Sequence, residues 1–401
     1  MTRFNRRLRF ALVLAILILI GLGVWFYYIY FISKDAITQR AENFLFRRMK
    51  VAQLSEQGTY RFFYITNRRP GPDKTSLDQR FGTEREEILK FGSFDTRIEP
   101  ELGLGMIIDA TKWFQNEEIQ LKTVEELDRA SFVEQVQTLV QDSPHQALLV
   151  IVHGFREAFP SALRKTAFLG HILDINSPVL LFDWPGNQGS SLRGYRRARE
   201  VAEASGEDLA HTLKLIIKEI QPERLWLMAN SMGGQVVTDA FSLMYRDTDF
   251  ADAETEIENV VLTAPDVDLE EFDNRFKEEI KALAGNLTVY VSSNDRALLA
   301  SRIINRGRRR GESTLNIRNP DQFEAASRVS ELVEPDNELI TLVDVTPVNR
   351  TRNFHNFSLE TPEFFDDLYL RLINRTTPQS RLQYQITTAD GAVYWVLTRG
   401  R

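Results

Sequence analysis

The 401-residue sequence contains no cysteine. This absence excludes thiolate nucleophiles, disulfide bonds and cysteine-ligated zinc, and it leaves the redox compartment of the protein open. Histidine is scarce as well, because there are only five, and no two of them lie within five positions of each other. Since a helical zinc motif needs histidines at positions i and i+4, the sequence predicts no metal site of that kind.

Positive charge is in short supply outside the first 50 residues. The formal net charge is −7, from 49 Lys and Arg against 56 Asp and Glu. Residues 1–50 hold nine basic and two acidic side chains, a net charge of +7, so the other 351 residues, with 40 basic and 54 acidic, carry −14. An acidic body of this size argues against a nucleic-acid partner, because phosphate contacts need a basic face.

One long uncharged run lies near the N-terminus. Residues 10–32 contain no charged side chain. As a helix they would rise roughly 34 Å, enough to cross a hydrocarbon core of about 30 Å. The sequence therefore predicts a transmembrane helix at 10–32, between a basic tail at 1–9 and a linker or juxtamembrane helix at 33–57. A cleaved signal peptide is the competing interpretation, but its apolar region is shorter and ends in a small-residue cleavage site.

The charges that flank this run predict its orientation. Arg6, Arg7 and Arg9 precede the run, whereas Lys34 beyond it is offset by Asp35. The positive-inside tendency then predicts a cytoplasmic N-terminus and an extracytoplasmic body. Four further basic residues up to position 50 weaken this prediction, and they could equally lie near lipid headgroups or in a solvated linker.

From residue 58 onward, apolar runs rich in Val, Ile and Leu alternate with amphipathic stretches of helical period. This alternation is typical of an α/β domain, a mostly parallel sheet with helices on both faces. We predict one such domain at 58–376 and a C-terminal β-hairpin at 377–401, around a turn at 389–391. Its predicted strands are 60–66, 106–110, 147–152, 179–183, 225–229, 257–263, 287–292 and 339–345, and the clearest helices are 195–220, 235–245 and 269–283.

The sharpest chemical signal is a serine between small residues. Ser231 follows the predicted strand 225–229 and is flanked by Ala229, Gly233 and Gly234. Small flanks suit a tight turn from strand to helix, in which larger side chains would collide while the hydroxyl is pushed above the sheet edge. The following helix directs its N–H groups and positive dipole end at an oxygen that gains charge. Ser231 is the predicted nucleophile, and an ordinary glycine-rich turn is the alternative.

Around this serine the chain resembles the α/β-hydrolase superfamily, and within it a poorly characterised branch of esterase- and lipase-like serine hydrolases. Two positions depart from the usual pattern, Ala229 in place of glycine and Asn230 in place of histidine. The resemblance covers about residues 58–375. It rests on five further segments, Tyr64-Ile65-Thr66-Asn67-Arg68, His153-Gly154-Phe155, Asp183-Trp184-Pro185-Gly186, Ala264-Pro265-Asp266-Val267-Asp268 and Tyr290-Val291-Ser292-Ser293-Asn294-Asp295-Arg296-Ala297-Leu298.

The resemblance implies a catalytic triad whose members follow along the chain as serine, acid and histidine. His355 is the only histidine after Ser231, so it is the predicted base. Asp295 directly follows a predicted strand and is the expected acid, which would orient the imidazole and stabilise its protonated form. Asp266 and Asp268 also follow a strand, and they remain alternative acids or helix-capping residues.

The resemblance also implies an oxyanion hole built from two backbone N–H groups. One belongs to Met232, the residue after the nucleophile, and the other to Phe155, in the loop after a predicted strand. Gly154 would let this loop turn so that the Phe155 amide faces the site. In this interpretation His153 is a structural residue of the loop.

The expected function is that of a membrane-anchored serine hydrolase acting on a small-molecule or lipid-like ester. It would form an acyl-enzyme on Ser231 and needs no metal or organic cofactor. An acyltransferase is one alternative, because it shares the first half-reaction, and an inactive interaction module on the same fold is another. The basic residues at 302–310 indicate either a site for anionic headgroups or substrates, or a solvated, ion-paired loop.

Overall fold

A computed structural model describes the part of the chain that carries the predicted sheet. The chain divides into two units, Met1–Arg47 and Arg48–Arg401, and the fold below belongs to the second. Apart from Gly21, the described residues are 50–55, 58–98, 119–247, 257–268, 272, 276–292, 340–349, 357–373, 383–387 and 393–398. Outside them lie the rest of the run at 10–32, the predicted strand at 106–110 and the basic residues at 302–310. Within the described part, no helix is long and apolar enough to cross a bilayer.

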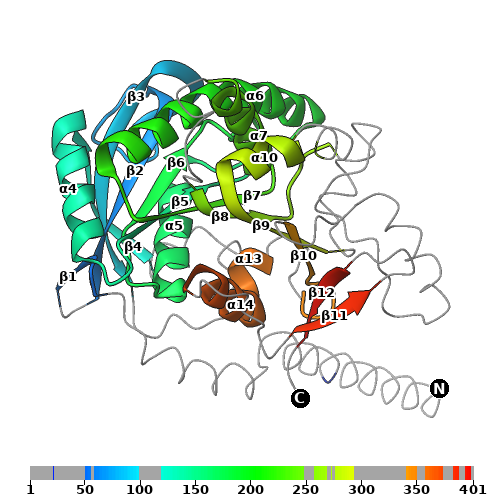
Figure 1. The fold of residues 1–401 in the computed structure, drawn as a ribbon. Helices are drawn as coiled ribbons and strands as arrows, with labels where there is room; N and C mark the ends of the chain where they lie inside the picture. The colour runs from blue at the N-terminus through cyan, green and yellow to red at the C-terminus, as the bar shows by residue number, and fades with distance from the viewer. Residues whose placement is uncertain are drawn as a thin grey trace, which may run out of the picture. The chain divides into compact units, whose positions relative to one another are not determined.

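Twelve strands form one mixed sheet, in the order β11-β12-β10-β9-β8-β7-β5-β6-β2-β3-β4, with β1 beside β2 (Figure 1). The run from β12 to β2 is parallel throughout, and the strands outside it are antiparallel to their neighbours. This confirms the predicted mostly parallel sheet. The strands are β1 Gln53–Ser55, β2 Thr59–Pro70, β3 Phe81–Ile98, β4 Ile119–Leu127, β5 Ala147–Val152, β6 Val179–Asp183, β7 Arg224–Asn230, β8 Ile257–Thr263, β9 Ala284–Val291, β10 Ile340–Asp344, β11 Gln383–Thr387 and β12 Val393–Leu397.

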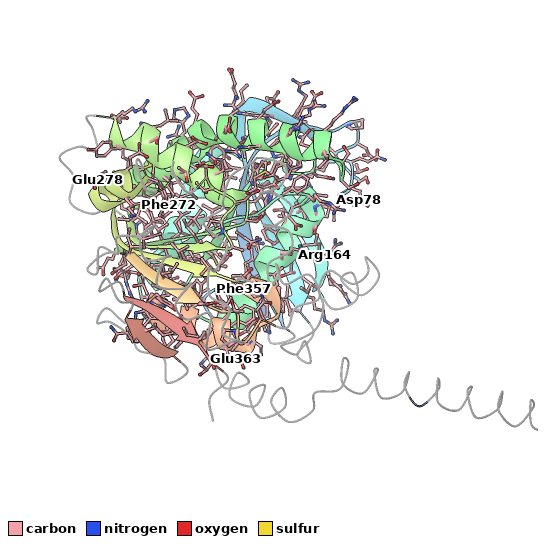
Figure 2. All side chains as sticks on the ribbon, turned by 90° about the vertical axis from the view of Figure 1, so that its right-hand side faces the viewer. Asp78, Arg164, Phe272, Glu278, Phe357 and Glu363 are labelled. Carbon is pink, nitrogen blue, oxygen red and sulfur yellow. The ribbon has the colours of Figure 1, made fainter. Side chains whose placement is uncertain are left out.

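Helices cover both faces of the sheet, as the sequence predicts. Helices α4, α6, α7 and α10 lie on one face, and α5, α13 and α14 lie on the other (Figure 1). Figure 2 shows the same division from the side, with Phe272 and Glu278 on one face and Phe357 and Glu363 on the other. The helices are α4 Arg129–Asp142, α5 Phe159–Leu173, α6 Leu192–Leu215 with a π-helical continuation Ile216–Ile220, α7 Gly233–Tyr245, α10 Lys277–Leu283, α13 Phe357–Glu360 and α14 Pro362–Ile373.

Successive residues of the central strands serve the two faces in turn. Leu148, Val150 and Val152 of β5 join the apolar core under α4, α6 and α7. The next strand residue along points to the opposite face, because strand side chains alternate. On that face Tyr290 of β9 packs against Phe364 of α14, with ring centroids 4.8 Å apart. The face to which the last polar side chain of a strand points therefore decides which helices that side chain can contact.

The C-terminal strands complete the main sheet. β11 and β12 pair antiparallel, and β12 also pairs parallel with β10, so the hairpin extends the sheet edge. A buried cluster reinforces this join: the Tyr290 hydroxyl donates to Asp367 Oδ2 at 2.5 Å, and Gln383 Nε2 donates to Asp367 Oδ1 at 2.6 Å. Strand β9, helix α14 and the hairpin are thereby held together.

Candidate active site

Ser231 occupies a strained turn between β7 and α7. Its φ is +52°, in the left-handed region. That region costs a non-glycine residue about 1–3 kcal/mol, and such strain persists only where the surroundings hold it. Here the Ser231 N–H donates to the Thr263 carbonyl at 2.9 Å, and the Ser231 carbonyl accepts from Gly234 at 2.9 Å and from Asp266 at 3.0 Å. The nucleophile predicted from the sequence thus lies in the turn geometry that a nucleophile elbow requires.

The glycines around this turn are explained by close backbone packing. A Cβ on Gly233 would lie 2.6 Å from the His153 carbonyl oxygen, and one on Gly154 would lie 3.0 Å from Ser231 Cβ. Both distances are shorter than ordinary van der Waals contact. The loop after β5 therefore lies directly against the serine, as the predicted oxyanion hole requires.

Two amides are available beside Ser231. Among the described residues, neither the Met232 N–H nor the Phe155 N–H has a hydrogen-bond acceptor. Helix α7 begins at Gly233 without a side-chain cap, so its positive end is left to other acceptors. These features suit donors to an oxyanion.

The candidate acid Asp266 has a clear partner. It is buried, and the Tyr195 hydroxyl of α6 donates to its Oδ2 at 2.6 Å. Tyr195 also packs edge-on against Phe155, with ring centroids 5.6 Å apart. The Asp266 carboxylate therefore meets the face covered by α6. Asp268 is partly exposed, and Asp295 lies outside the described residues.

The predicted base His355 also lies outside the described residues, but described residues before and after it in the chain make contacts near the site. The Asn349 side-chain amide donates to Ser292 Oγ at 2.9 Å, joining the ends of β10 and β9. Beyond the base, Ser358 of α13 donates to Asn230 Oδ1 at 3.2 Å. In the sequence, Asn230 stands out only as a departure from the usual pattern. Four further contact residues carry no signal there, because their partners are distant in the chain: Tyr195, Ser292, Asn349 and Ser358.

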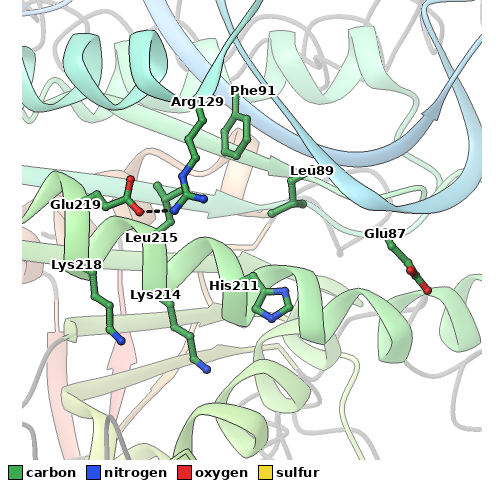
Figure 3. A pocket seen from close by; sticks show the side chains of 9 residues that line it. All are labelled: Glu87, Leu89, Phe91, Arg129, His211, Lys214, Leu215, Lys218 and Glu219. Carbon is green, nitrogen blue, oxygen red and sulfur yellow. Dashed lines mark hydrogen bonds and ion pairs between the residues drawn. The ribbon is translucent and has the colours of Figure 1, made fainter.

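A cavity of about 420 Å³ lies away from Ser231, between β3, the start of α4 and α6 (Figure 3). Its apolar floor includes Leu89 and Phe91, and Arg129 at its rim forms an ion pair with Glu219. It contains none of the predicted catalytic residues. Nor do the described residues contain a group of three or more His, Asp or Glu placed to hold a metal ion.

Comparison with known proteins identifies a family. The family model described as "Alpha/beta hydrolase of unknown function (DUF900)" matches residues 128–370. No protein with a curated description matches the chain.

Several solved structures are similar at low identity. One is an uncharacterised protein from Bacillus cereus ATCC 10987, with 14% identity over 55% of this chain and a TM-score of 0.33; the match spans 60% of that protein's length. Another is the esterase Est2 of Thermogutta terrifontis with propionate bound, with 13% identity and a TM-score of 0.31. This match covers 58% of this chain and 86% of the esterase chain. A third is a zinc-bound cold-adapted esterase from an Arctic intertidal metagenomic library, with 10% identity, 79% of this chain, 96% of that chain and a TM-score of 0.35.

Proposed function

The chain belongs to the DUF900 family of α/β hydrolases, and from that premise we propose that it is a serine hydrolase that cleaves carboxylic esters through an acyl-enzyme on Ser231. The observation that carries this proposal is the strained backbone of Ser231 at the strand-to-helix turn, with φ of +52°. Other non-glycine residues of the described part also have positive φ, but Ser231 has it at the turn from β7 to α7, where a nucleophile elbow holds the hydroxyl above the sheet edge.

The proposed reaction has two half-reactions. His355 takes the proton of Ser231 as the hydroxyl oxygen attacks the acyl carbonyl, and the Met232 and Phe155 amides hold the oxyanion. Protonated His355 then gives its proton to the departing alkoxide, which leaves the acyl group on Ser231. Water, activated by His355, attacks this acyl-enzyme and releases the carboxylic acid.

The hydrogen bonds around the base support His355 for this role. Ser358 lies three positions after His355, a length of chain that spans at most about 11 Å, and Ser358 is bonded to the residue before the nucleophile. The same length separates Asp295 from Ser292, whose hydroxyl accepts from Asn349. The base-bearing segment is thus tied at one end to the elbow and at the other to the strand end that precedes Asp295, which we propose as the acid.

A fluorophosphonate probe tests the proposed nucleophile directly. We expect the folded 401-residue chain to react with the probe, and peptide mass mapping to place the phosphonyl group on Ser231. Chain that has been heat-denatured before probe addition is the control, because it keeps the serine but loses the turn and the amides. Folded chain that stays unlabelled, or carries the label elsewhere, would contradict the proposal. Esters of short to long acyl chains, assayed with and without added alcohols, then define the substrate and separate hydrolysis from acyl transfer.

We propose further that residues 10–32 anchor the hydrolase in a membrane, with the N-terminus in the cytoplasm. The support is the uncharged run itself and the three arginines that precede it. We expect the chain to resist alkaline extraction from membranes, a variant lacking 10–32 to be released, and a C-terminal reporter to be active outside the cytoplasm. Release of the intact chain, or reporter activity confined to the cytoplasm, would contradict anchoring or orientation respectively.

A further inference from the structure

A buried cluster of ionisable side chains lies directly behind the loop that carries Phe155. Its members come from the ends of three neighbouring strands: Arg68 from β2, His153 after β5 and Asp183 from β6. Arg68 is 1% exposed and Asp183 is fully buried. No step of the proposed reaction uses these groups, so their place beside the site needs a separate account.

Asp183 is the centre of this cluster. Its carboxylate accepts from Arg68 Nε at 2.7 Å and Thr66 Oγ1 at 2.7 Å, and it lies 3.0 Å from His153 Nε2. Burial by itself raises the pKa of Asp183, but the Arg68 charge and the His153 contact outweigh it and hold the pKa below its usual value. Asp183 is therefore a charged acceptor at neutral pH.

The His153 ring is fixed on both edges and on one face. Besides the Nε2 contact with Asp183, its Nδ1 lies 2.9 Å from the carbonyl oxygen of Gly154, and the Trp184 amide lies 3.2 Å from Nε2. The ring stacks on Trp184, with centroids 5.5 Å apart and an interplanar angle of 8°. The imidazole cannot turn without losing its contact with the loop carbonyl.

The same cluster holds the loop at further points. Trp184 Nε1 donates to the His153 carbonyl at 2.8 Å. Arg68 Nη2 donates to the Trp184 carbonyl at 2.6 Å and to the Glu157 carbonyl at 2.8 Å, so one guanidinium joins the loops after β5 and β6. On its other side the loop meets the elbow, because a Cβ on Gly154 would lie 3.0 Å from Ser231 Cβ. Phe155 is thus one residue beyond the most tightly held point of the loop.

We propose that Asp183 and Arg68 are positioning residues for the oxyanion hole, and that they act through the His153 ring on the Gly154 carbonyl and so on the Phe155 amide. This inference rests on the proposed function. Its physical basis is that a backbone donor is effective only when held at the place where the oxyanion forms. A displacement of about 1 Å costs on the order of 10²-fold in rate. A buried ion pair is by itself a weak source of stability, so the positioning of the loop is the function that accounts for this one.

The test compares His153→Ala with His153→Asn in the 401-residue chain. The Asn side-chain amide can donate to the Gly154 carbonyl from the place of Nδ1, whereas Ala cannot. We expect His153→Ala to lower kcat for an activated ester by about 10²-fold, with KM changed less than about threefold. The affinity for a trifluoromethyl ketone, which forms an oxyanion on the serine, should fall in parallel. His153→Asn should recover a large part of both kcat and the affinity for the ketone.

Asp183→Asn tests the cluster at its centre, and Asp367→Asn is the matched control. Asp367 is also a fully buried acid bonded to an arginine, but it lies among Arg371, Tyr290 and Gln383 and outside the catalytic machinery. Both variants are expected to lower Tm, and only Asp183→Asn to weaken the ketone. If Asp183→Asn does not fold, Trp184→Phe, which removes the indole N–H donated to His153, should weaken the ketone about three- to tenfold.

The outcomes separate this inference from the proposed function. Wild-type chain that neither hydrolyses esters nor reacts at Ser231 would overturn the proposed function. An active wild type would instead overturn the positioning role if His153→Ala bound the ketone as tightly as wild type does. Equal effects of Asp183→Asn and Asp367→Asn on the ketone would overturn it as well, because they would show general loss of stability.

Discussion

Replacing Ser231 with alanine is expected to lower ester hydrolysis by about 10⁶-fold, because the nucleophile is lost while the rest of the site remains. Alanine can take the place of serine without new strain, since both are non-glycine residues at the same left-handed φ. The three backbone hydrogen bonds of residue 231 do not involve its side chain. Tm should therefore stay within a few degrees of wild type, and steady-state kinetics with an activated ester measure the loss.

The serine and the base should fail as a unit. His355→Ala is expected to cost about as much as Ser231→Ala, and the double variant no more than either alone, because the hydroxyl and the imidazole act only together. A residual rate above that of water should survive from the amides of the oxyanion hole. Losses that multiply in the double variant would show that the two residues do not share one step, and would contradict the triad. A Ser231→Ala variant with wild-type turnover would show that Ser231 is not the nucleophile.

Some parts of this fold can be predicted because their signal is continuous in the sequence. The predicted bounds of β5, β6 and β8 match the structure, since these strands are covered on both faces and each contains a run of at least three apolar residues. The strand β3 was missed. Much of its first half is exposed and charged, so neither an apolar run nor a regular alternation marks it. Helix α5 was missed for the opposite reason, because eleven of its fifteen residues are buried and no polar stripe reveals its period.

The residues of the site also differ in whether the sequence can predict them. The elbow at Ser231 could be predicted because its small residues are neighbours in the chain, and steric need is visible at that range. The roles of Arg68 and Asp183 could not, since 115 residues separate them and only the order of the strands brings them together. Asn230 is an intermediate case. The sequence shows an unusual residue there, but its hydrogen bonds to Thr263 and Ser358 depend on the direction of its side chain at the end of β7.

Replacing the proposed catalytic acid should cause the second large loss of activity. Asp295→Asn is expected to lower kcat by about 10⁴-fold, because an amide in place of the carboxylate holds the imidazole in the wrong tautomer. Asp266→Asn should cost less than about tenfold. The Asp266 carboxylate accepts from Tyr195 of α6, whereas Ser358, three positions after His355, belongs to α13 on the opposite face of the sheet and donates to Asn230. An acid engaged on the α6 face is expected to contribute less to orienting a base whose neighbour Ser358 lies on the other face.

Tyr195→Phe is the matched control for Asp266, because it removes the hydroxyl that donates to the carboxylate and leaves the charge and the ring in place. If Asp266 only fixes its loop against α6, then Asp266→Asn and Tyr195→Phe should have similar small effects on kcat and similar effects on Tm. If Asp266 is the catalytic acid, Asp266→Asn should lower kcat by about 10⁴-fold, while Tyr195→Phe should leave the enzyme active. This second outcome, together with an active Asp295→Asn variant, would show that the catalytic acid is Asp266, after β8, and not Asp295, after β9. It would also mean that the base reaches across the elbow to the face covered by α6.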